Sequence, residues 1–161
     1  MRTMIASTIS AIVMGAFPLC WLGDAHSTGS GLITKPSNYS VQETAQRFED
    51  GVRSKGWVVF TEIDHAAAAK AVGLDMKPRT VIIFGNPKVG TAPMQKSATL
   101  AIDNPPKALV WQDDQGKVWL TYNSGEYLGS TIYPRHGLSM PAEAVKSLER
   151  LLAEISNQAT E

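Results

Sequence analysis

A short apolar strand that runs directly into a glycine- and proline-rich segment is the feature that most constrains this chain. Thr80 to Phe84 is a β-branched, apolar run typical of a strand buried at the centre of a sheet. The next ten residues, Gly85 to Met94, hold two glycines, which permit unusual backbone angles, and two prolines, which remove N–H donors. We predict a rigid loop there, with backbone amides that can face a ligand.

The spacing within this loop argues against one familiar class of ligand. Gly85 and Gly90 stand at the separation seen in phosphate-binding loops, and they follow a strand. Thr91, however, occupies the position that requires a lysine, and Pro93 obstructs the helix that should begin there. A nucleotide-binding loop is therefore not expected. The segment is either a structural turn or one wall of a binding site.

The length and charge of the chain limit its size class and its partners. With 161 residues, of which 43% are hydrophobic, the chain suits a single globular domain with a substantial core. Its 15 basic and 15 acidic side chains give a formal net charge of zero. Because nucleic-acid binding leaves a basic footprint, we expect no nucleic-acid partner.

The N-terminus has the pattern of an export signal. One basic residue, Arg2, precedes an apolar run from Met4 to Leu19, and small residues follow at Gly23 and Ala25. We predict a cleaved signal peptide over residues 1–25 and a periplasmic or secreted protein, with no membrane span after cleavage. An uncleaved membrane anchor is the alternative.

Cleavage would also remove Cys20, the one cysteine of the chain. The mature protein would then form no disulfide and use no thiolate in catalysis or metal binding. We predict a short flexible tether over residues 26–31, a single domain over 32–156 and a disordered tail over 157–161.

Strand and helix patterns alternate along the predicted domain. Strands are expected over 32–35, 57–63, 80–84, 107–112 and 117–123, and helices over 41–55, 65–72 and from about 139 to 155. Ser40 is expected to cap the first helix and Gly56 to end it, and residues alternate between two faces along Val118 to Asn123. The alanine-rich helix is expected to pack tightly against the sheet or a partner, and Leu148 lies on the apolar face of the last helix. A turn at 113–116 makes the last two strands a hairpin. This order predicts an α+β fold, a two-layer sandwich in which helices cover one face of a mixed, mostly antiparallel sheet of about five strands.

Several separated motifs together resemble one known family. They are Ile63-Asp-His65 with Gly73-Leu74, Phe84 to Thr91 with Met94, Ile102-Asp103, Lys107 to Trp111, Val118 to Asn123 and Arg135-His-Gly137. In order and spacing they are similar to the domain of unknown function 302 family, over about Leu32 to Ile155. The resemblance implies a compact, mostly bacterial α/β domain that forms homodimers and has no established chemistry. The chain departs from the family pattern at Asn104 and Pro106, and it is longer between Leu128 and Arg135.

Three residues are candidates for acid–base chemistry. His65 begins a predicted helix, where the helix dipole favours a neutral imidazole, and His136 lies beside Arg135. Asp103 paired with His136 or His65 would make an acid–base pair if the fold brings them together. The alternative for each histidine is a structural surface position.

A binding surface is predicted where the loop at 84–94 meets the end of the hairpin and the segment 127–136. Polar strand ends orient ligands, and a basic pair there would supply charge. The residues expected to share one concave surface are Asn86, Lys88, Tyr122, Asn123, Arg135 and His136.

A metal site is a further hypothesis. Cleavage after Ala25 would leave His26 as the first residue, and an N-terminal histidine can chelate copper together with a second histidine such as His65 or His136. A terminal histidine on a mobile tether is the alternative. No haem-attachment motif is present in the sequence, and we expect no cofactor.

These observations favour a small-molecule or protein binding module of the cell envelope. A hydrolase-like enzyme using Asp103 with a histidine is the second hypothesis, and a copper- or haem-handling protein is the third. We also expect a homodimer, because three strand tryptophans, Trp57, Trp111 and Trp119, are more than a small domain readily buries.

Overall fold

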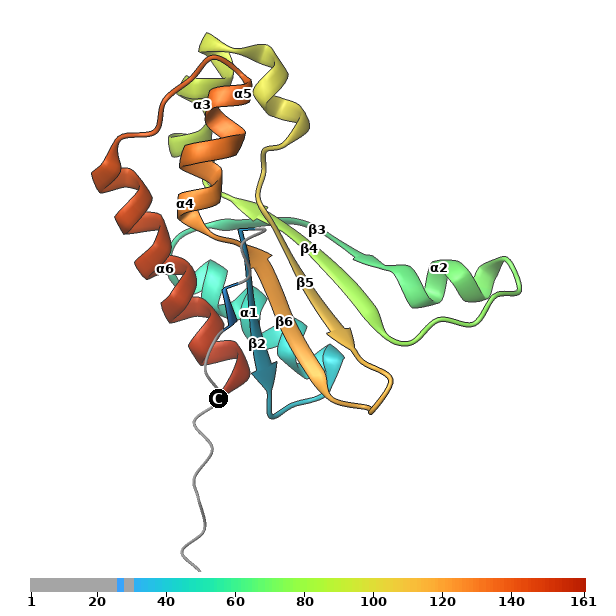
Figure 1. Cartoon of the computed structure of the whole chain (residues 1–161). Helices are drawn as coiled ribbons and strands as arrows, with labels where there is room; N and C mark the ends of the chain where they lie inside the picture. The colour runs from blue at the N-terminus through green and yellow to red at the C-terminus, as the bar shows by residue number, and fades with distance from the viewer. Residues whose placement is uncertain (1–25, 28–30) are drawn as a thin grey trace, which may run out of the picture.

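An antiparallel sheet with helices on one face forms the body of the protein (Figure 1). The computed structural model describes residues 26–27 and 31–161, so the predicted signal peptide over 1–25 lies outside the described residues. The sheet order is β1-β2-β6-β5-β4-β3, and every pair of neighbouring strands is antiparallel. The strands are β1 (His26–Ser27), β2 (Leu32–Ser37), β3 (Val58–Asp64), β4 (Arg79–Gly85), β5 (Lys107–Gln112) and β6 (Val118–Asn123).

Two long helices cover one face of this sheet, and the shorter helices other than α2 gather at one of its ends (Figure 1). The long helices are α1 (Val41–Ser54) and α6 (Ala142–Thr160), which pack against each other and against the strands. The short ones are α2 (His65–Ala71), α3 (Pro87–Lys96), the 3-10 helix η1 (Ala98–Ile102), α4 (Gly125–Tyr127), the π-helical turn η2 (Leu128–Ile132) and α5 (Tyr133–Arg135). The predicted α+β class, with helices on one face, is confirmed.

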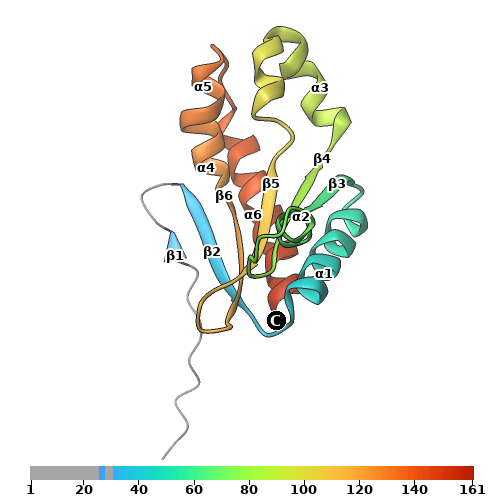
Figure 2. The same ribbon diagram turned by 90° about the vertical axis from the view of Figure 1, so that its right-hand side faces the viewer.

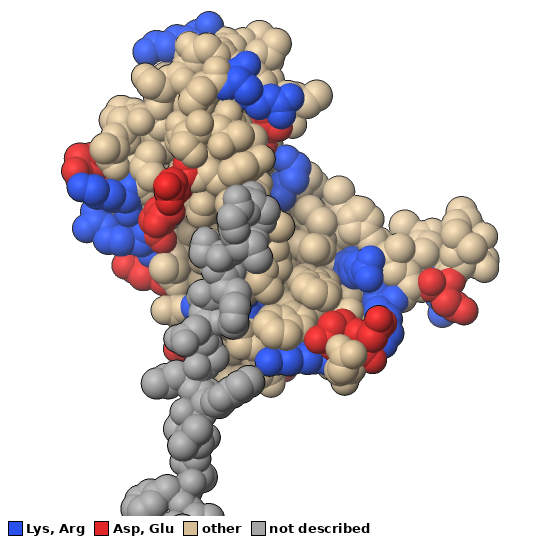
Figure 3. All heavy atoms as spheres, viewed as in Figure 1, with Lys and Arg blue, Asp and Glu red and all other residues tan. Residues whose placement is uncertain are grey.

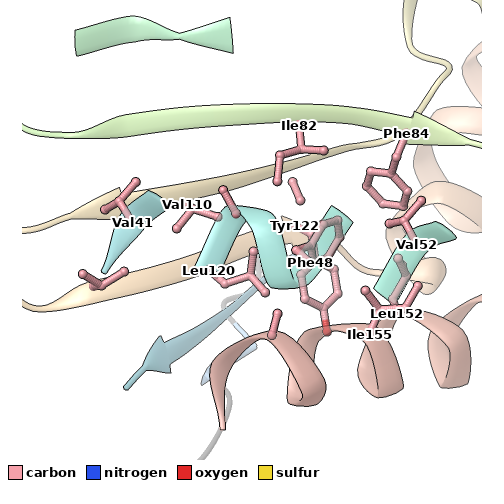
Figure 4. Close-up of a cluster of buried hydrophobic side chains, with 14 residues drawn as sticks. Val41, Phe48, Val52, Ile82, Phe84, Val110, Leu120, Tyr122, Leu152 and Ile155 are labelled. Atoms are coloured by element: carbon pink, nitrogen blue, oxygen red, sulfur yellow. The ribbon is translucent and has the colours of Figure 1, made fainter. Parts of the chain in front are cut away.

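The main core lies between the two long helices and the sheet. Figure 4 shows Phe48 of α1 and Ile155 of α6 in the same cluster as Ile82 and Leu120 of the sheet, and all of them are fully buried. The helices approach closely because Gly51 has no side chain: a Cβ there would lie 3.0 Å from the Cγ2 atom of Ile155. This packing fixes the framework on which the rest of the molecule is built.

The ends of α1 follow from its flanking residues. The Ser40 side chain accepts a hydrogen bond of 3.1 Å from the amide of Glu43, which caps the N-terminus. At the other end Gly56 adopts a φ of 72°, and its amide donates to the Arg53 carbonyl. A left-handed glycine at this position terminates a helix, as the sequence predicted.

A two-strand arm projects from the far edge of the sheet. In Figure 1, β3, α2 and the beginning of β4 extend away from the long helices. Asp64 caps α2 by accepting a bond of 2.9 Å from the amide of Ala67. No residue of α2 is buried, so of the two expected packings of this alanine-rich helix, against the sheet or against a partner, the first is wrong. Figure 3 shows basic and acidic side chains interspersed on this side of the molecule rather than gathered into one patch.

The two ends of the predicted domain are more ordered than expected. His26 and Ser27, which we placed in a flexible tether, pair with Thr34 and Ile33. The predicted disordered tail over 157–161 is also wrong, because α6 continues to Thr160 and buries Ala159. The Thr160 carbonyl accepts a hydrogen bond from the amide of Asn38, which ties this end of α6 to the turn before α1.

The second face of the sheet carries no helix in the part of the chain that the structure describes. Trp111 and Trp119 lie on this face as cross-strand neighbours, with ring centroids 6.2 Å apart. The predicted hairpin turn beneath them is held by Asp113, whose carboxylate accepts from the Trp119 indole at 2.7 Å and from the amides of Gln115 and Lys117. These bonds hold the pKa of Asp113 below its usual value.

Candidate functional site

A pocket of about 830 Å³ lies at the helical end of the sheet. Its two walls are α3 and the chain from Leu128 to Leu151, which face each other above the strands in Figure 2. Apolar side chains dominate the lining, and its volume is within the range of small-molecule sites. The lining includes Trp57, Gly85, Asn86, Val89, Pro93, Lys96, Asn104, Pro106, Leu128, Tyr133, Leu138, Met140, Ser147, Leu148 and Leu151.

The α3 wall is a helix where the sequence predicted a loop. Asn86 caps it, its side chain accepting a bond of 3.0 Å from the amide of Lys88, and Pro87 takes the first helical position, where a missing N–H costs nothing. Pro93 lies inside the helix. The prediction that it prevents helix formation is therefore wrong. The two glycines of the segment also do not have positive φ angles, so the predicted reason for their presence does not hold.

The opposite wall is a run of short helices held against α6. Leu128 and Ile132 are buried with Leu100 of η1 in a second apolar cluster, separate from the main core. Gly125 and Gly129 let this run approach α6: a Cβ on Gly125 would lie 2.9 Å from the Val145 carbonyl. The five-residue π-helical turn at Leu128–Ile132 belongs to this run, and such turns occur frequently at functional sites.

A side-chain bridge joins the segment that follows α3 to His136 in the opposite wall. The Nε2 atom of His136, at the end of α5, lies 2.6 Å from Oδ2 of Asp103, and its Nδ1 lies 2.9 Å from Oγ1 of Thr99. The His136 side chain is 5% exposed, whereas that of Asp103 is 22% exposed and also pairs with Arg135 at 3.4 Å. The hydrogen bond from His136 holds the pKa of Asp103 below its ordinary value, and Arg135 adds to the effect.

The fold thus places two of the three candidate acid–base residues together. His136 and Asp103 form the pair that the sequence left open, and Thr99 is a third member that the sequence analysis did not identify. His65 begins α2 on the exposed arm and takes no part in this bridge. A histidine between a carboxylate and a hydroxyl is an arrangement that can move a proton.

The predicted binding residues do not all share one surface. Asn86 lines the pocket, whereas Lys88 is exposed on α3 and does not line it. Tyr122 is buried in the main core, where its hydroxyl lies 3.2 Å from Ser156 Oγ and burial raises its pKa. Asn123 ends β6 opposite Leu32, outside the lining. Arg135 and His136 are also outside the lining, so Asn86 alone of the six predicted residues belongs to it. The prediction of one shared concave surface is therefore wrong, and for Tyr122 the reason is that alternation along β6 directs its side chain toward α6.

Several lining residues were not identified as site residues from the sequence. Trp57 was treated as a strand tryptophan, and Leu148 was assigned to the core face of the last helix. Lys96 carried no signal, and the segment from Ser139 to Pro141 was treated only as the start of the last helix. The apolar spacing of Leu148 and Leu151 could have indicated that α6 presents apolar residues beyond the main core, but it could not indicate an empty space beside them.

The histidines proposed for a copper site are far apart in the fold. His26 lies in β1 at one edge of the sheet, His65 follows β3 at the other edge, and His136 belongs to the bridge with Asp103. Within residues 26–27 and 31–161, no three metal-ligating side chains group together. In that same part of the chain, no helix has the length and hydropathy required to cross a bilayer.

Comparison with known proteins agrees with this architecture. The model of the domain of unknown function DUF302 matches residues 33–155. The crystal structure of an uncharacterised conserved DUF302 protein from Bacillus stearothermophilus has the same fold, with a TM-score of 0.65 at 18% identity, covering 80% of this chain and 98% of that one.

Curated relatives at higher identity are longer proteins. The fluoride-specific ion channel FluC 1 of Brucella suis and that of Brucella abortus are each 44% identical to this chain over 120 residues. The match covers 74% of this chain but only 46% and 43% of those proteins, so the chain spans less than half of their length. On the family match over 33–155, this chain belongs to the DUF302 family.

Proposed function

We propose that this protein is a binding module of the cell envelope that takes a small, largely apolar molecule into the pocket between α3 and α6. The observation that carries the proposal is the pocket itself, about 830 Å³ in volume and lined mainly by apolar side chains with a few polar groups. The matched segment of 120 residues makes up less than half of the longer relative from Brucella suis, which supports a domain that is used as a module.

A substitution that fills the pocket tests this function. Ala92 lines the pocket, and its neighbour Thr91 is exposed on the same helix without lining it. We expect a small molecule to co-purify with the full chain and with Thr91→Trp, and to be absent from Ala92→Trp, in native mass spectra of folded protein. The proposal fails if Ala92→Trp retains the same molecule, or if neither the wild type nor Thr91→Trp binds any member of an apolar compound library.

The proposed location is the periplasm or the exterior of the cell. The apolar run from Met4 to Leu19 and the small residues Gly23 and Ala25 support it. N-terminal sequencing of protein from cell-envelope fractions should give His26 as the first residue. An intact Met1 in the membrane fraction would replace this proposal with a membrane-anchored protein.

We further propose a homodimer formed through the uncovered face of the sheet. Strand pairing places Ile63, Val81 and Leu109 side by side across β3, β4 and β5, next to the stacked Trp111 and Trp119. Exposed apolar surface of this kind is typical of interaction sites, and two such faces can stack as in a β-sandwich. A symmetric dimer requires one patch to fit its own copy.

Light scattering of paired variants tests the dimer. Ile63 and Met76 are similarly exposed, at 40% and 43%, but Ile63 lies in strand β3 on the uncovered face, whereas Met76 lies in the connection between α2 and β4. We expect the wild type and Met76→Lys to have the mass of two chains, and Ile63→Lys to have that of one. A wild-type protein with the mass of one chain at micromolar concentration would contradict the dimer.

A hydrolase-like enzyme is the second candidate function, and the bridge of Thr99, His136 and Asp103 favours it. Its two hydrogen bonds, 2.9 Å and 2.6 Å, would let His136 withdraw the Thr99 proton while Asp103 stabilises the imidazolium. Hydrolysis of p-nitrophenyl esters by the wild type should then fall at least about 100-fold in His136→Gln and be unchanged in His65→Gln. Equal activity in the two variants would eliminate the bridge as a catalytic site.

A further inference from the structure

We propose that the ligand of this pocket is an amphipathic monocarboxylate, a molecule with an extended apolar chain and one negative head group held by Lys96. This inference rests on the binding function proposed above and names the class of ligand. It follows from the distribution of charge around the pocket and from the direction in which α3 runs along it.

The pocket lining holds a single charged side chain. All of its lining residues belong to the described part of the chain, and among them Lys96 is the one charged residue, with no aspartate or glutamate present. Within residues 26–27 and 31–161, Lys96 makes no ion pair with an acidic side chain. A cationic ligand would therefore bury its charge beside a like charge, whereas an anion would gain a partner.

The position of Lys96 on α3 defines the shape of the ligand. Lys96 is the last residue of α3, and Asn86 caps the first turn, so the two residues are separated by about 15 Å along the helix at 1.5 Å per residue. Between them the wall presents Val89, Ala92 and Pro93 to the pocket. A head group at Lys96 would leave the apolar part of the ligand to extend along this wall toward Trp57 at the end of the sheet.

The number of charges favours a carboxylate over a phosphate. A phosphate monoester carries about −1.5 to −2 charges at neutral pH, and one lysine would balance only part of that charge. A carboxylate carries one. The lining also holds uncharged hydrogen-bond donors, such as Asn104 and Ser139, which add no charge to the site.

Helix α3 offers a matched control for this inference. Both of its lysines are exposed, but Lys88 lies outside the pocket lining, whereas Lys96 belongs to it. A change in ligand affinity that follows from the net charge of the protein alone should therefore appear in both Lys88→Gln and Lys96→Gln.

Isothermal titration calorimetry of the full chain with three ten-carbon probes tests the ligand class. The probes are decanoate, decanol and decylammonium, all used below their micellar concentrations. We expect decanoate to bind the wild type about tenfold or more tighter than decanol, and decylammonium to bind more weakly than either. Lys96→Gln should remove the preference for decanoate and leave decanol affinity unchanged, whereas Lys88→Gln should retain the wild-type preference.

The possible results separate this inference from the proposed binding function. If decanol binds as tightly as decanoate, or if Lys88→Gln removes the preference as fully as Lys96→Gln does, the monocarboxylate inference is wrong while the apolar pocket function stands. If no probe binds and no ligand co-purifies, both proposals fail together.

Discussion

Two short helices of this protein, α2 and α3, begin in the same way and have different surroundings. Each follows a strand, and each is capped by an Asp or Asn side chain that accepts a hydrogen bond from a backbone amide. Neither helix contains a buried residue. Helix α2 stands on an exposed arm, whereas α3 leads into the apolar cluster of Leu100, Leu128 and Ile132 and lines the pocket. The comparison teaches that a cap starts a helix, but the neighbours supplied by distant segments decide whether it contributes to a site.

The largest difference between these two regions should appear when an apolar side chain is shortened. Leu128 is 5% exposed in the cluster beside α3, and Leu74, after α2, is 64% exposed. We expect Leu128→Ala to lower the free energy of unfolding by about 2–5 kcal/mol, since it removes buried contacts and leaves a cavity. Leu74→Ala should change it by less than about 0.5 kcal/mol.

Urea denaturation followed by circular dichroism measures both values on the same protein preparation. If Leu74→Ala destabilises the protein as much as Leu128→Ala, the arm contributes to stability in a way that the exposed position of α2 does not indicate. The comparison between the two regions would then be wrong.

A methyl group added where helices touch should have the next largest effect. A Cβ on Gly125 would lie 2.9 Å from the Val145 carbonyl and 2.7 Å from Glu149 Cγ, so α4 would have to move away from α6. We predict that Gly125→Ala costs about 1–3 kcal/mol of unfolding free energy and weakens ligand binding at the same time. Ser130→Ala, an exposed change in the same run of helices, is the control. A Gly125→Ala protein of wild-type stability would show that the wall is free to shift.

Removal of the two caps compares the helices directly. Asn86→Ala and Asp64→Ala each delete one side-chain bond to a backbone amide, of 3.0 Å and 2.9 Å respectively. We expect Asn86→Ala to lower the free energy of global unfolding by about 0.5–2 kcal/mol, because α3 packs against η1, whose Leu100 is buried in the second apolar cluster. Asp64→Ala should instead accelerate amide hydrogen exchange within α2 alone, with no change in the global unfolding transition. Equal global effects would indicate that α2 is coupled to the core.

The smallest expected effect is a dependence on pH at the bridge. Because the hydrogen bond from His136 lowers the pKa of Asp103 below 3.8, the bridge contributes its full stabilisation above that value. The contribution is then lost as the pH falls through the lower pKa of the folded protein. Unfolding free energies measured between pH 6 and pH 3 should therefore decline less steeply in Asp103→Asn than in the wild type. An unchanged slope in Asp103→Asn would contradict the assignment.

Local signals in the sequence predicted the framework correctly. The capping serine at Ser40, the terminating Gly56 and the alternation along Val118 to Asn123 each depend on neighbouring residues, and each has the expected structure. The same reasoning failed at α3, where Pro93 was read as a barrier to a helix that Asn86 and Pro87 nevertheless start. It failed again at α6, whose final turn is held by contacts with residues more than a hundred positions away.

The candidate site was less predictable, because it depends on which segments meet in space. Asp103 and His136 are 33 positions apart, and their individual residue types could suggest a pair without showing that they touch. Thr99 was not considered, because a lone threonine carries no signal in the sequence. The pocket is an unfilled volume between segments, and neither periodicity nor composition encodes an unfilled volume.

Helix α6 serves two regions at once, and this restricts how the protein could acquire a different ligand. Its first half, including Ser147 and Leu151, lines the pocket, while its second half buries Leu152 and Ile155 in the main core. A change of side-chain volume in the first half would shift the whole helix and thereby disturb the packing of Leu152 and Ile155 in the main core. Altered specificity, whether by evolution or by design, should therefore arise first from α3 and from the segment Leu138 to Met140, which can vary without disturbing the sheet.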